Sequence, residues 1–202
     1  MSDRSHWDRI YGNGRDEDLS WHEEEPSLSL ELIREACALP CRVIDVGGGS
    51  SVLAQRLVTV DQAEVAVLDI CETALKIAQA RAGDEASSIR WIVADVTVTE
   101  DIGTYDVWHD RAVFHFLTEP EERQAYTTLA SNTLPRGGFA IIATFGPGGP
   151  TSCSGLPVCR YDSTSLAREL GGDFELHRSL VTTHRTPGGV SQEFVYSVFM
   201  RQ

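Results

Sequence analysis

The sequence has no long hydrophobic run and few positive charges. None of its apolar segments approaches the roughly 18 consecutive residues that a membrane-spanning helix needs. Thirty aspartate and glutamate residues outnumber 17 arginine and lysine residues, which gives a formal net charge of −13. This charge repels phosphate groups, so we expect neither nucleic acid nor a membrane as a partner. The N-terminus is polar and acidic, whereas a signal peptide is basic and then apolar, so we expect a cytoplasmic protein.

The sequence also lacks a Cys-x-x-Cys pair. Its five cysteines are Cys37, Cys41, Cys71, Cys153 and Cys159. Their odd number and their spacing argue against a disulfide framework and against a structural zinc site. We therefore expect buried or partly buried thiols and no bound metal.

The 202 residues, 42% of them hydrophobic, suffice for a single domain with its own core. The negative charge is concentrated at the start of the chain. Residues 1–31 contain nine acidic and three basic side chains, a net charge of −6. We expect residues 1–40 to form an acidic N-terminal extension and residues 41–202 to form the domain.

From residue 42 onward, short β-branched runs alternate with helical segments, a pattern typical of βαβ units and a mainly parallel sheet. Strands are expected at residues 42–46, 64–69, 89–93, 105–109 and 139–145. Helices are expected at about residues 50–59, 72–82, 119–134 and 163–170. Two further strands, 174–183 and 192–200, flank a Pro-Gly-Gly turn and predict a β-hairpin. The fold class is therefore α/β, a Rossmann-like, mostly parallel sheet with helices on both faces and an antiparallel terminal hairpin.

Three glycines, residues 47–49, follow the first expected strand and precede a helix. Such glycines let the backbone approach a ligand at a helix N-terminus. The nicotinamide-dinucleotide fingerprint is incomplete, because Val52 stands where it has its third glycine. Asp69 ends the second strand, where a carboxylate can bind both hydroxyls of a ribose. The alternatives are a plain turn for the glycines and a helix N-cap for Asp69.

The third expected strand leads to Asp95, whose carboxylate can accept a hydrogen bond from an adenine amino group, or can simply be part of a turn. The chain also contains the motifs Ile44-Asp-Val-Gly-Gly-Gly49, Leu68-Asp-Ile70, Ala94-Asp-Val96 and Pro135-Arg-Gly-Gly138. Together with the hairpin, they resemble the class I S-adenosylmethionine-dependent methyltransferases over about residues 41–200. The resemblance implies a seven-stranded sheet, S-adenosylmethionine as cofactor and S-adenosylhomocysteine as product.

The resemblance also implies the positions of the cofactor. Its methionine end is expected near Gly47 and Gly49, its ribose on Asp69, and its adenine near the residues that follow the second and third strands. The complete expected cofactor-binding set is Trp21, Asp45, Gly47, Gly49, Asp69, Ile70, Asp95, Val96 and Asp110.

A closer resemblance involves Trp7-Asp-Arg9, Trp21-His22 and Val107-Trp-His-Asp-Arg-Ala112, which are similar to the thiopurine and thiol methyltransferases and their tellurite-resistance relatives. In that branch an N-terminal aromatic residue covers the donor sulfonium, a contact that cation–π attraction explains. Trp21 is the matching position. Similar features occur in protein lysine methyltransferases. The Asn/Asp-Pro-Pro-aromatic signature of amino-methylating nucleic-acid enzymes is absent.

Methyl transfer from a sulfonium is an in-line displacement that requires alignment and an unprotonated nucleophile. At the end of the fourth strand, Asp110 can bind the donor amine or act as a base, and His115 or His109 can accept a proton. The alternatives are an ion-paired loop for Asp110 and core packing for His115, which lies between two phenylalanines. The substrate candidates are Tyr11, Arg111, Cys153 and Arg160.

Three functions compete. We favour a methyltransferase that acts on a small-molecule nucleophile, such as a thiol. The second is a protein (lysine) methyltransferase whose acidic extension meets a basic target, and the third is a non-catalytic cofactor-binding module. The extension carries Trp7, Tyr11 and Trp21, so we expect it to close over the cofactor as a mobile cover, the alternative being a solvated terminus.

Overall fold

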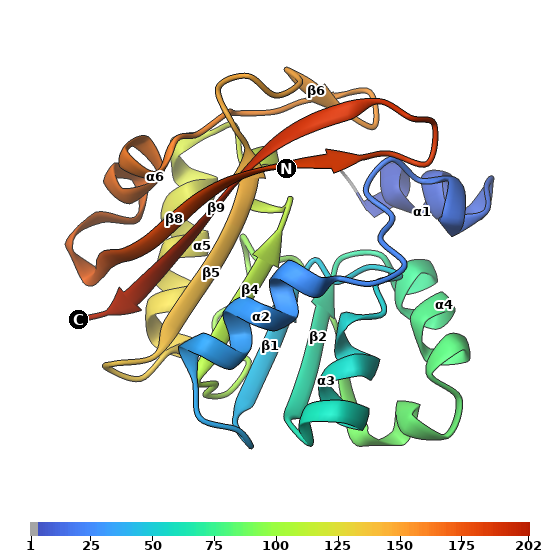
Figure 1. Cartoon of the computed structure of the whole chain (residues 1–202), viewed down its shortest axis with the longest axis horizontal. Helices are drawn as coiled ribbons and strands as arrows, with labels where there is room; N and C mark the ends of the chain where they lie inside the picture. Colours follow the sequence, from blue (N-terminus) through green and yellow to red (C-terminus); the bar gives the residue numbers. More distant parts are fainter. Residues whose placement is uncertain (1–3) are drawn as a thin grey trace.

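The computed structural model describes residues 4–202, and a seven-stranded sheet lies at their centre (Figure 1). The strands follow the order β3-β2-β1-β4-β5-β9-β8. The parallel strands are β1 (Arg42–Val46), β2 (Glu64–Asp69), β3 (Ile89–Val93), β4 (Val107–Arg111) and β5 (Phe139–Phe145). Strand β9 (Ser191–Arg201) is antiparallel both to β5 and to β8 (Phe174–Arg185). The predicted Rossmann-like sheet with an antiparallel hairpin is confirmed.

The strand order reverses between β1 and β4, where open α/β sheets bind their ligands. Strand β4 ends two residues later than the sequence predicts. His109, Asp110 and Arg111 are polar, but they continue the strand because they pair with residues 141–143 of β5. Side chains alternate between the faces of a strand, so His109 and Asp110 point to opposite sides of the sheet.

Helices cover both faces of the sheet (Figure 1). On one face lie α2 (Ser27–Ala36), α3 (Leu53–Asp61) and α4 (Glu72–Ala82), and on the other lie α5 (Pro120–Thr133) and α6 (Ser163–Leu170). Ile33, Leu57 and Val43 are fully buried in the first layer, and Trp108 and Tyr126 are fully buried in the second. Burial of each such side chain contributes about 1.5–3 kcal/mol, so both layers hold the sheet rigidly.

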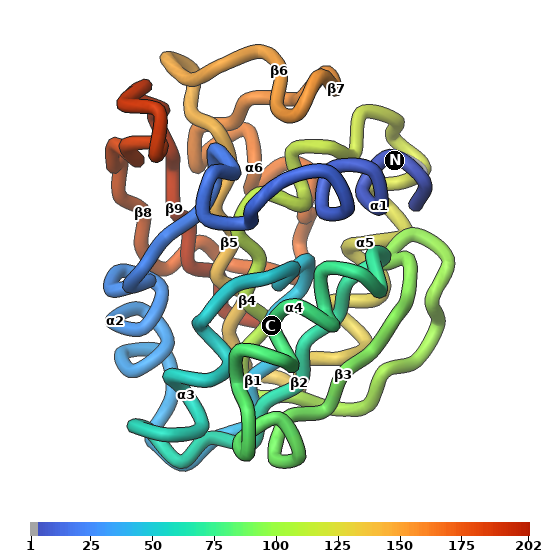
Figure 2. The backbone as a smooth tube through the Cα atoms, turned by 90° about the vertical axis from the view of Figure 1, so that its right-hand side faces the viewer, coloured from blue at the N-terminus to red at the C-terminus, as the bar shows by residue number. Residues whose placement is uncertain are grey.

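The described part of the predicted N-terminal extension (residues 1–40) starts at residue 4 and consists of two different parts. Residues 4–25, here called the cover, contain α1 (Arg4–Gly12) and the short helix η1 (Asp16–Asp18), and they cross the carboxyl ends of the strands (Figure 2). Helix α2 was not expected from the sequence. Its Leu30, Leu32 and Ile33 are buried against the sheet, so α2 belongs to the core and only the residues before it lie over the strand ends.

The structure corrects one expectation about the cysteines. Cys37 and Cys41 form a disulfide in the short connection between α2 and β1. Because α2 ends at Ala36 and β1 begins at Arg42, the chain turns back here and brings the two sulfurs together. The other three cysteines are thiols, as expected, of which Cys71 and Cys153 are buried.

Short elements complete the domain. They are η2 (Gly83–Ser88), η3 (Phe114–Phe116), η4 (Gly171–Asp173), β6 (Ser152–Cys153) and β7 (Leu156–Pro157). Strands β6 and β7 belong to the long connection after β5, which also reaches the carboxyl end of the sheet (Figure 2). Within residues 4–202, the helices are too short or too polar to cross a lipid bilayer.

Candidate active site

A cavity of about 710 Å³, part of it open to solvent, lies at the carboxyl ends of β1, β2 and β4. Its floor is formed by residues that follow these strands, and its roof comes from the cover and from the β6–β7 connection. The lining residues are Trp7, Tyr11, Trp21, Val46, Gly47, Leu68, Asp69, Ile70, Ala94, Val96, Arg111, Ala112, Val113, Phe116 and Cys153. Most of the predicted cofactor residues thus surround one space.

The glycine loop after β1 needs its glycines for two reasons. Gly47 and Gly49 have φ angles of +65° and +52°, a region that other residues rarely adopt. A Cβ atom on Gly47 would lie 1.9 Å from Val113 Cγ2, and one on Gly49 would lie 2.5 Å from the hydroxyl of Tyr11. The loop therefore packs too closely against its neighbours for any larger residue.

Asp69 connects the end of β2 to this loop. Its Oδ2 accepts a hydrogen bond from Gly49 N at 2.9 Å, and its Oδ1 accepts one from Cys71 N at 2.7 Å. Each carboxylate oxygen has further lone pairs, so these bonds leave acceptor capacity toward the cavity. Burial raises the pKa of Asp69 to about 6, although the two backbone N–H groups oppose this rise.

The structure separates Asp95 from its neighbours in the predicted adenine site. Ile70, Ala94 and Val96 line the cavity, but Asp95 does not. Asp95 Oδ1 accepts hydrogen bonds from the backbone N and from Oγ1 of Thr97, at 2.8 and 2.6 Å. Asp95 Oδ1 thus holds the turn after β3, and a bond from Asp95 to the cofactor stays a prediction.

The structure also places Asp110 differently from the expectation that it binds the donor amine or acts as a base. Its side chain points to the α5 face and is fully buried, away from the cavity. Its Oδ1 accepts from Val113 N at 2.8 Å, and its Oδ2 accepts from Phe114 N at 3.0 Å and from the Tyr126 hydroxyl at 2.7 Å. Burial raises the pKa of Asp110 to about 6. Asp110 thus caps the turn after β4 and can reach neither a donor amine nor an acceptor.

The structure likewise places His115 differently from the expectation that it accepts a proton from the substrate. It is fully buried between the rings of Phe116 and Phe145, and its Nδ1 accepts a hydrogen bond from Phe145 N at 3.3 Å. Burial lowers the pKa of His115 to about 3, so the ring is neutral. Because His115 does not line the cavity, the alternative of core packing describes it and a role as catalytic base does not.

Aromatic side chains of the cover roof the cavity. The ring of Trp7 packs edge-on against the rings of Trp21 and Phe116, with centroid-to-centroid distances of 6.0 and 5.1 Å. Trp21 Nε1 donates a hydrogen bond to the Tyr11 hydroxyl at 3.3 Å. The cover is anchored to the domain by Asp8, whose Oδ1 accepts hydrogen bonds from the side chains of Cys71 and Thr73 in and beside α4.

Arg111 joins the cover to β4 and lines the cavity. Its Nη1 donates to the carbonyl of Trp21 at 2.9 Å, its Nη2 lies 3.1 Å from Glu23 Oε1, and its Nε donates to the Tyr196 hydroxyl at 3.1 Å. Among the described lining residues, Arg111 is the only positively charged one. These bonds leave two of its five N–H groups for other acceptors.

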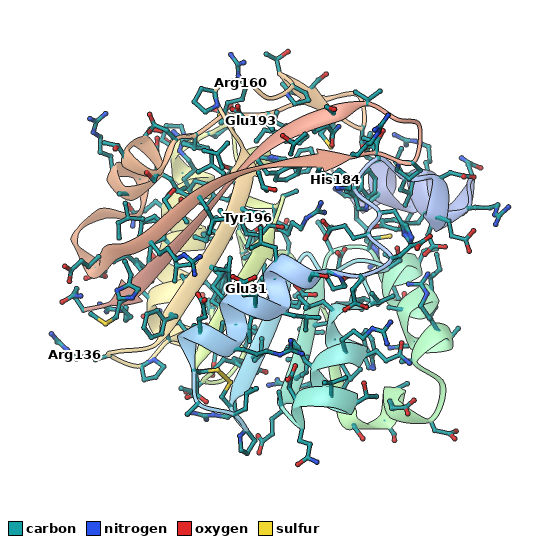
Figure 3. All side chains as sticks on the ribbon, viewed as in Figure 1. Glu31, Arg136, Arg160, His184, Glu193 and Tyr196 are labelled. Atoms are coloured by element: carbon teal, nitrogen blue, oxygen red, sulfur yellow. A yellow bond between two sulfur atoms is a disulfide. The ribbon has the colours of Figure 1, made fainter. Side chains whose placement is uncertain are left out.

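The two remaining substrate candidates lie in different places. Cys153 lines the cavity, and burial raises the pKa of its thiol. Arg160 lies away from it, at the outer end of the β6–β7 connection beside Glu193 (Figure 3). Arg160 Nη1 donates to the carbonyl of Pro147 at 2.7 Å and so holds this loop together. It lines neither the first cavity nor the second one described below, and its role toward a substrate stays a prediction.

A second, more polar cavity of about 570 Å³, part of it also open to solvent, adjoins the first behind the glycine loop. Asp45, His109 and Ser29 line it, and it shares Tyr11, Trp21, Gly47 and Arg111 with the first cavity. Sequence reasoning missed Ser29 because it did not identify α2. In the part of the chain that the structure describes, no group of three or more His, Cys, Asp or Glu side chains is arranged to hold a metal ion.

Comparison with known proteins agrees with this geometry. Residues 43–138 match the model of a family described as a methyltransferase domain. A search of curated protein sequences finds no match. Among solved structures, an S-adenosylmethionine-dependent methyltransferase from Anabaena variabilis is 18% identical, with a TM-score of 0.79 over 100% of this chain and 96% of that one.

Two other solved structures are similar. The 1,6-didemethyltoxoflavin-N1-methyltransferase of Burkholderia thailandensis, with bound 1,6-didemethyltoxoflavin and S-adenosylhomocysteine, is 18% identical, with a TM-score of 0.74 over 98% of this chain and 87% of that one. TehB of Haemophilus influenzae is 16% identical, with a TM-score of 0.69 over 90% and 64%. These structures show that the chain has the fold of S-adenosylmethionine-dependent methyltransferases. Within that fold, residues 43–138 match the methyltransferase domain family.

Proposed function

We propose that this methyltransferase acts on a small molecule whose nucleophilic atom is soft, such as the sulfur of a thiol. One observation carries the proposal: among the described residues that line the first cavity, no side chain is free to act as a general base. Asp110 and His115 are sealed in the core, and burial raises the pKa values of Tyr11 and Cys153. The lone pairs of Asp69 that its two backbone N–H bonds leave free are assigned below to the ribose of the cofactor, so Asp69 does not serve the acceptor. The acceptor must therefore ionise without a protein base, and thiols do so near pH 8.5.

Arg111 supports the same acceptor class. A positive charge within a few ångströms favours the thiolate over the thiol and so increases the fraction of reactive nucleophile. The walls of the cavity around Arg111 include Trp7, Trp21 and Phe116. Such walls suit an apolar or aromatic body, because they bury its surface without leaving polar groups unpaired. The acceptor that fits both features is a hydrophobic thiol held with its sulfur toward Arg111.

Residues at the strand ends would hold the cofactor. The free lone pairs of Asp69 would accept from the ribose hydroxyls, and the side chains of Ile70 and Val96 would pack against the adenine. Gly47 and Gly49 let the methionine portion approach the backbone of the loop. When bound, the cofactor supplies the methyl group as an electrophilic sulfonium, and the chain aligns it and excludes water.

The second cavity takes the amino-acid end of the cofactor in this proposal. Asp45 supplies a carboxylate for the ammonium group, close to Gly48 of the loop. Trp21 lines both cavities and so lies where its ring can cover the sulfonium between them. These assignments keep the predicted cofactor roles of Trp21, Asp45, Gly47, Gly49, Asp69, Ile70 and Val96.

The alternative of a protein lysine methyltransferase has less support. The cover and the β6–β7 connection roof the cavity, and a lysine side chain would need a base to lose its proton. The toxoflavin methyltransferase that shares this fold acts on a small molecule.

The proposal is tested by measuring S-adenosylhomocysteine formation with S-adenosylmethionine and a panel of acceptors. The panel contains aromatic thiols, aliphatic thiols, a selenol, arsenite, and phenols and amines of the same size as the thiols. We expect turnover with aromatic thiols, rising with pH as the thiol ionises, and little turnover with the matched phenols. Turnover of the amines or phenols alone would overturn the soft-nucleophile assignment, as would no turnover with any thiol, selenol or arsenite.

A further inference from the structure

A buried chain of hydrogen bonds runs beneath the second cavity. Asp45 and His109 are neighbours on the paired strands β1 and β4, and Asp45 Oδ1 lies 2.7 Å from His109 Nδ1. On the other side of the ring, His109 Nε2 lies 2.9 Å from Ser29 Oγ in the first turn of α2. The three residues are only 3%, 2% and 1% exposed. Three separate elements thus meet through one imidazole ring.

The direction of one of these bonds follows from the chemistry of its partners. An ionised carboxylate can only accept, so His109 Nδ1 carries the proton in the bond to Asp45. The chain continues beyond Ser29, because the Tyr196 hydroxyl contacts Ser29 and accepts from Arg111 Nε. Tyr196 projects from β9 toward the α2 side of the sheet (Figure 3). Two opposite charges that line the second cavity, on Asp45 and Arg111, are therefore joined through buried groups.

The order Asp45, His109, Ser29 has the residue types of a hydrolase triad, in which the serine is the reactive end. Here Ser29 is inside a helix and almost inaccessible. The member of this chain that can contact a ligand is instead Asp45, whose carboxylate lines the second cavity. Its Oδ2 lies directly beneath the glycine loop, 2.6 Å from the position that a Cβ on Gly48 would occupy.

We propose that His109 is a positioning residue for the methyl donor, acting through Asp45. The Nδ1–H group holds Oδ1, so that Oδ2 stays directed at the ammonium group of the donor. Without this bond, the buried carboxylate would lose a hydrogen-bond partner and would be free to rotate away from the donor. This inference rests on the proposed function, specifically on the placement of the donor ammonium at Asp45.

Two substitutions of the same residue separate this role from simple packing. In His109→Asn, the amide nitrogen can occupy the position of Nδ1 and keep the bond to Asp45. In His109→Gln, the amide nitrogen reaches the position of Nε2 and meets Ser29 instead. Both variants lose part of the imidazole ring, so both lose stability, but only one loses the donor to Asp45.

The readouts are the affinity for S-adenosylhomocysteine by calorimetry and the separate values of kcat and KM for S-adenosylmethionine. We expect His109→Asn to bind S-adenosylhomocysteine within about threefold of wild type. His109→Gln should bind it about tenfold more weakly, and this loss should appear as a higher KM for S-adenosylmethionine. Ser29→Ala keeps the bond to Asp45 and should bind like His109→Asn. Tyr126→Phe, on the opposite face, removes a buried hydrogen bond and should lower only thermal stability. Equal affinities for the Asn and Gln variants would overturn the inference, whether both are weak or both are normal.

A measurement on the wild type covers the case in which a variant does not fold. We expect the proton on His109 Nδ1 to give a low-field NMR resonance that shifts when S-adenosylhomocysteine binds. A resonance unaffected by binding would overturn the inference. Failure of the proposed function looks different: the wild type would then not bind S-adenosylhomocysteine at all, or Asp45→Ala would bind it normally.

Discussion

Asp69 Oδ2 accepts a hydrogen bond from Gly49 N at 2.9 Å, so the end of β2 is bonded directly to the glycine loop that follows β1. One carboxylate thus shapes the loop and also faces the cavity in which the donor ribose is proposed to bind. A ligand that bonds to Asp69 therefore meets a loop whose conformation is already fixed, which lowers the entropy cost of binding.

Asp69→Ala should weaken S-adenosylhomocysteine binding by at least about 100-fold, because two hydrogen bonds to a charged group are lost together. Calorimetry measures this directly. Asp95→Ala is the matched control, since Asp95 also follows a strand but bonds only to Thr97, and its affinity should change less than threefold. Equal losses in the two variants would show that Asp95 holds the cofactor as strongly as Asp69 does.

Binding should also depend on pH below neutrality. Burial raises the pKa of Asp69 from its ordinary value of 3.8 to about 6. The folded protein then takes up a proton more readily than the unfolded chain, so the ligand-free fold gains stability as pH falls from about 6 to 4. Donor binding has the opposite sign, because it uses the carboxylate. We expect affinity for S-adenosylhomocysteine to fall about tenfold between pH 7 and pH 5.

The control for this pH dependence is Asp69→Asn, which has no charge to lose. Its weaker affinity should be nearly independent of pH over the same range. Asp110 has a similarly raised pKa, so part of the stability increase toward pH 4 should remain in this variant. A wild-type affinity that stays constant from pH 7 to pH 5 would show that the Asp69 charge is not used in binding.

His115→Asn tests whether the buried histidine takes part in chemistry. The amide oxygen can replace Nδ1 as the acceptor for Phe145 N, so the local hydrogen bond is kept while the imidazole is removed. We expect kcat to change by less than threefold, with an unaltered pH profile and a lower melting temperature. A loss of two or more orders of magnitude in kcat would return His115 to the role of base.

The sequence predicts the sheet more reliably than the direction of side chains at its edge. Runs rich in β-branched residues mark β1, β2, β3 and β5 with their observed limits. The fourth strand was predicted to end at His109, which left Asp110 outside it and free to face a ligand. Because the strand continues to Arg111, alternation turns Asp110 into the α5 layer and places His109 and Arg111 on the cavity side.

Helix α2 was missed for a different reason. The charge of residues 1–31 dominates that part of the sequence, and it conceals the helical spacing of Leu30 and Ile33. Ser29 and the disulfide between Cys37 and Cys41 depend on this helix, so neither could be predicted without it. Those two cysteines come together only through tertiary structure, and a count of five carries no information on which of them pair.

Substitutions of Arg111 and of Glu23 test the acceptor site, because they should shift the pH dependence of kcat/KM in opposite directions. Arg111→Met removes the positive charge, so an aromatic thiol should need a higher pH to reach half-maximal kcat/KM. Glu23→Gln removes the carboxylate that neutralises Arg111, so the profile should move to lower pH. Arg111→Lys keeps the charge and controls for the loss of packing. Profiles that coincide in all variants would show that Arg111 does not contact the nucleophile.

Two truncations test the division of the N-terminal extension. Deletion of residues 1–25 removes Trp7, Tyr11 and Trp21 but leaves α2, so the domain should fold and bind S-adenosylhomocysteine at least about tenfold more weakly. Deletion of residues 1–36 also removes Leu30 and Ile33, whose burial contributes about 1.5–3 kcal/mol each, and this chain should not fold cooperatively. Thermal unfolding followed by circular dichroism separates the two outcomes. If the shorter deletion leaves the affinity unchanged, the acidic residues 1–25 do not serve as a cover and only solvate the surface.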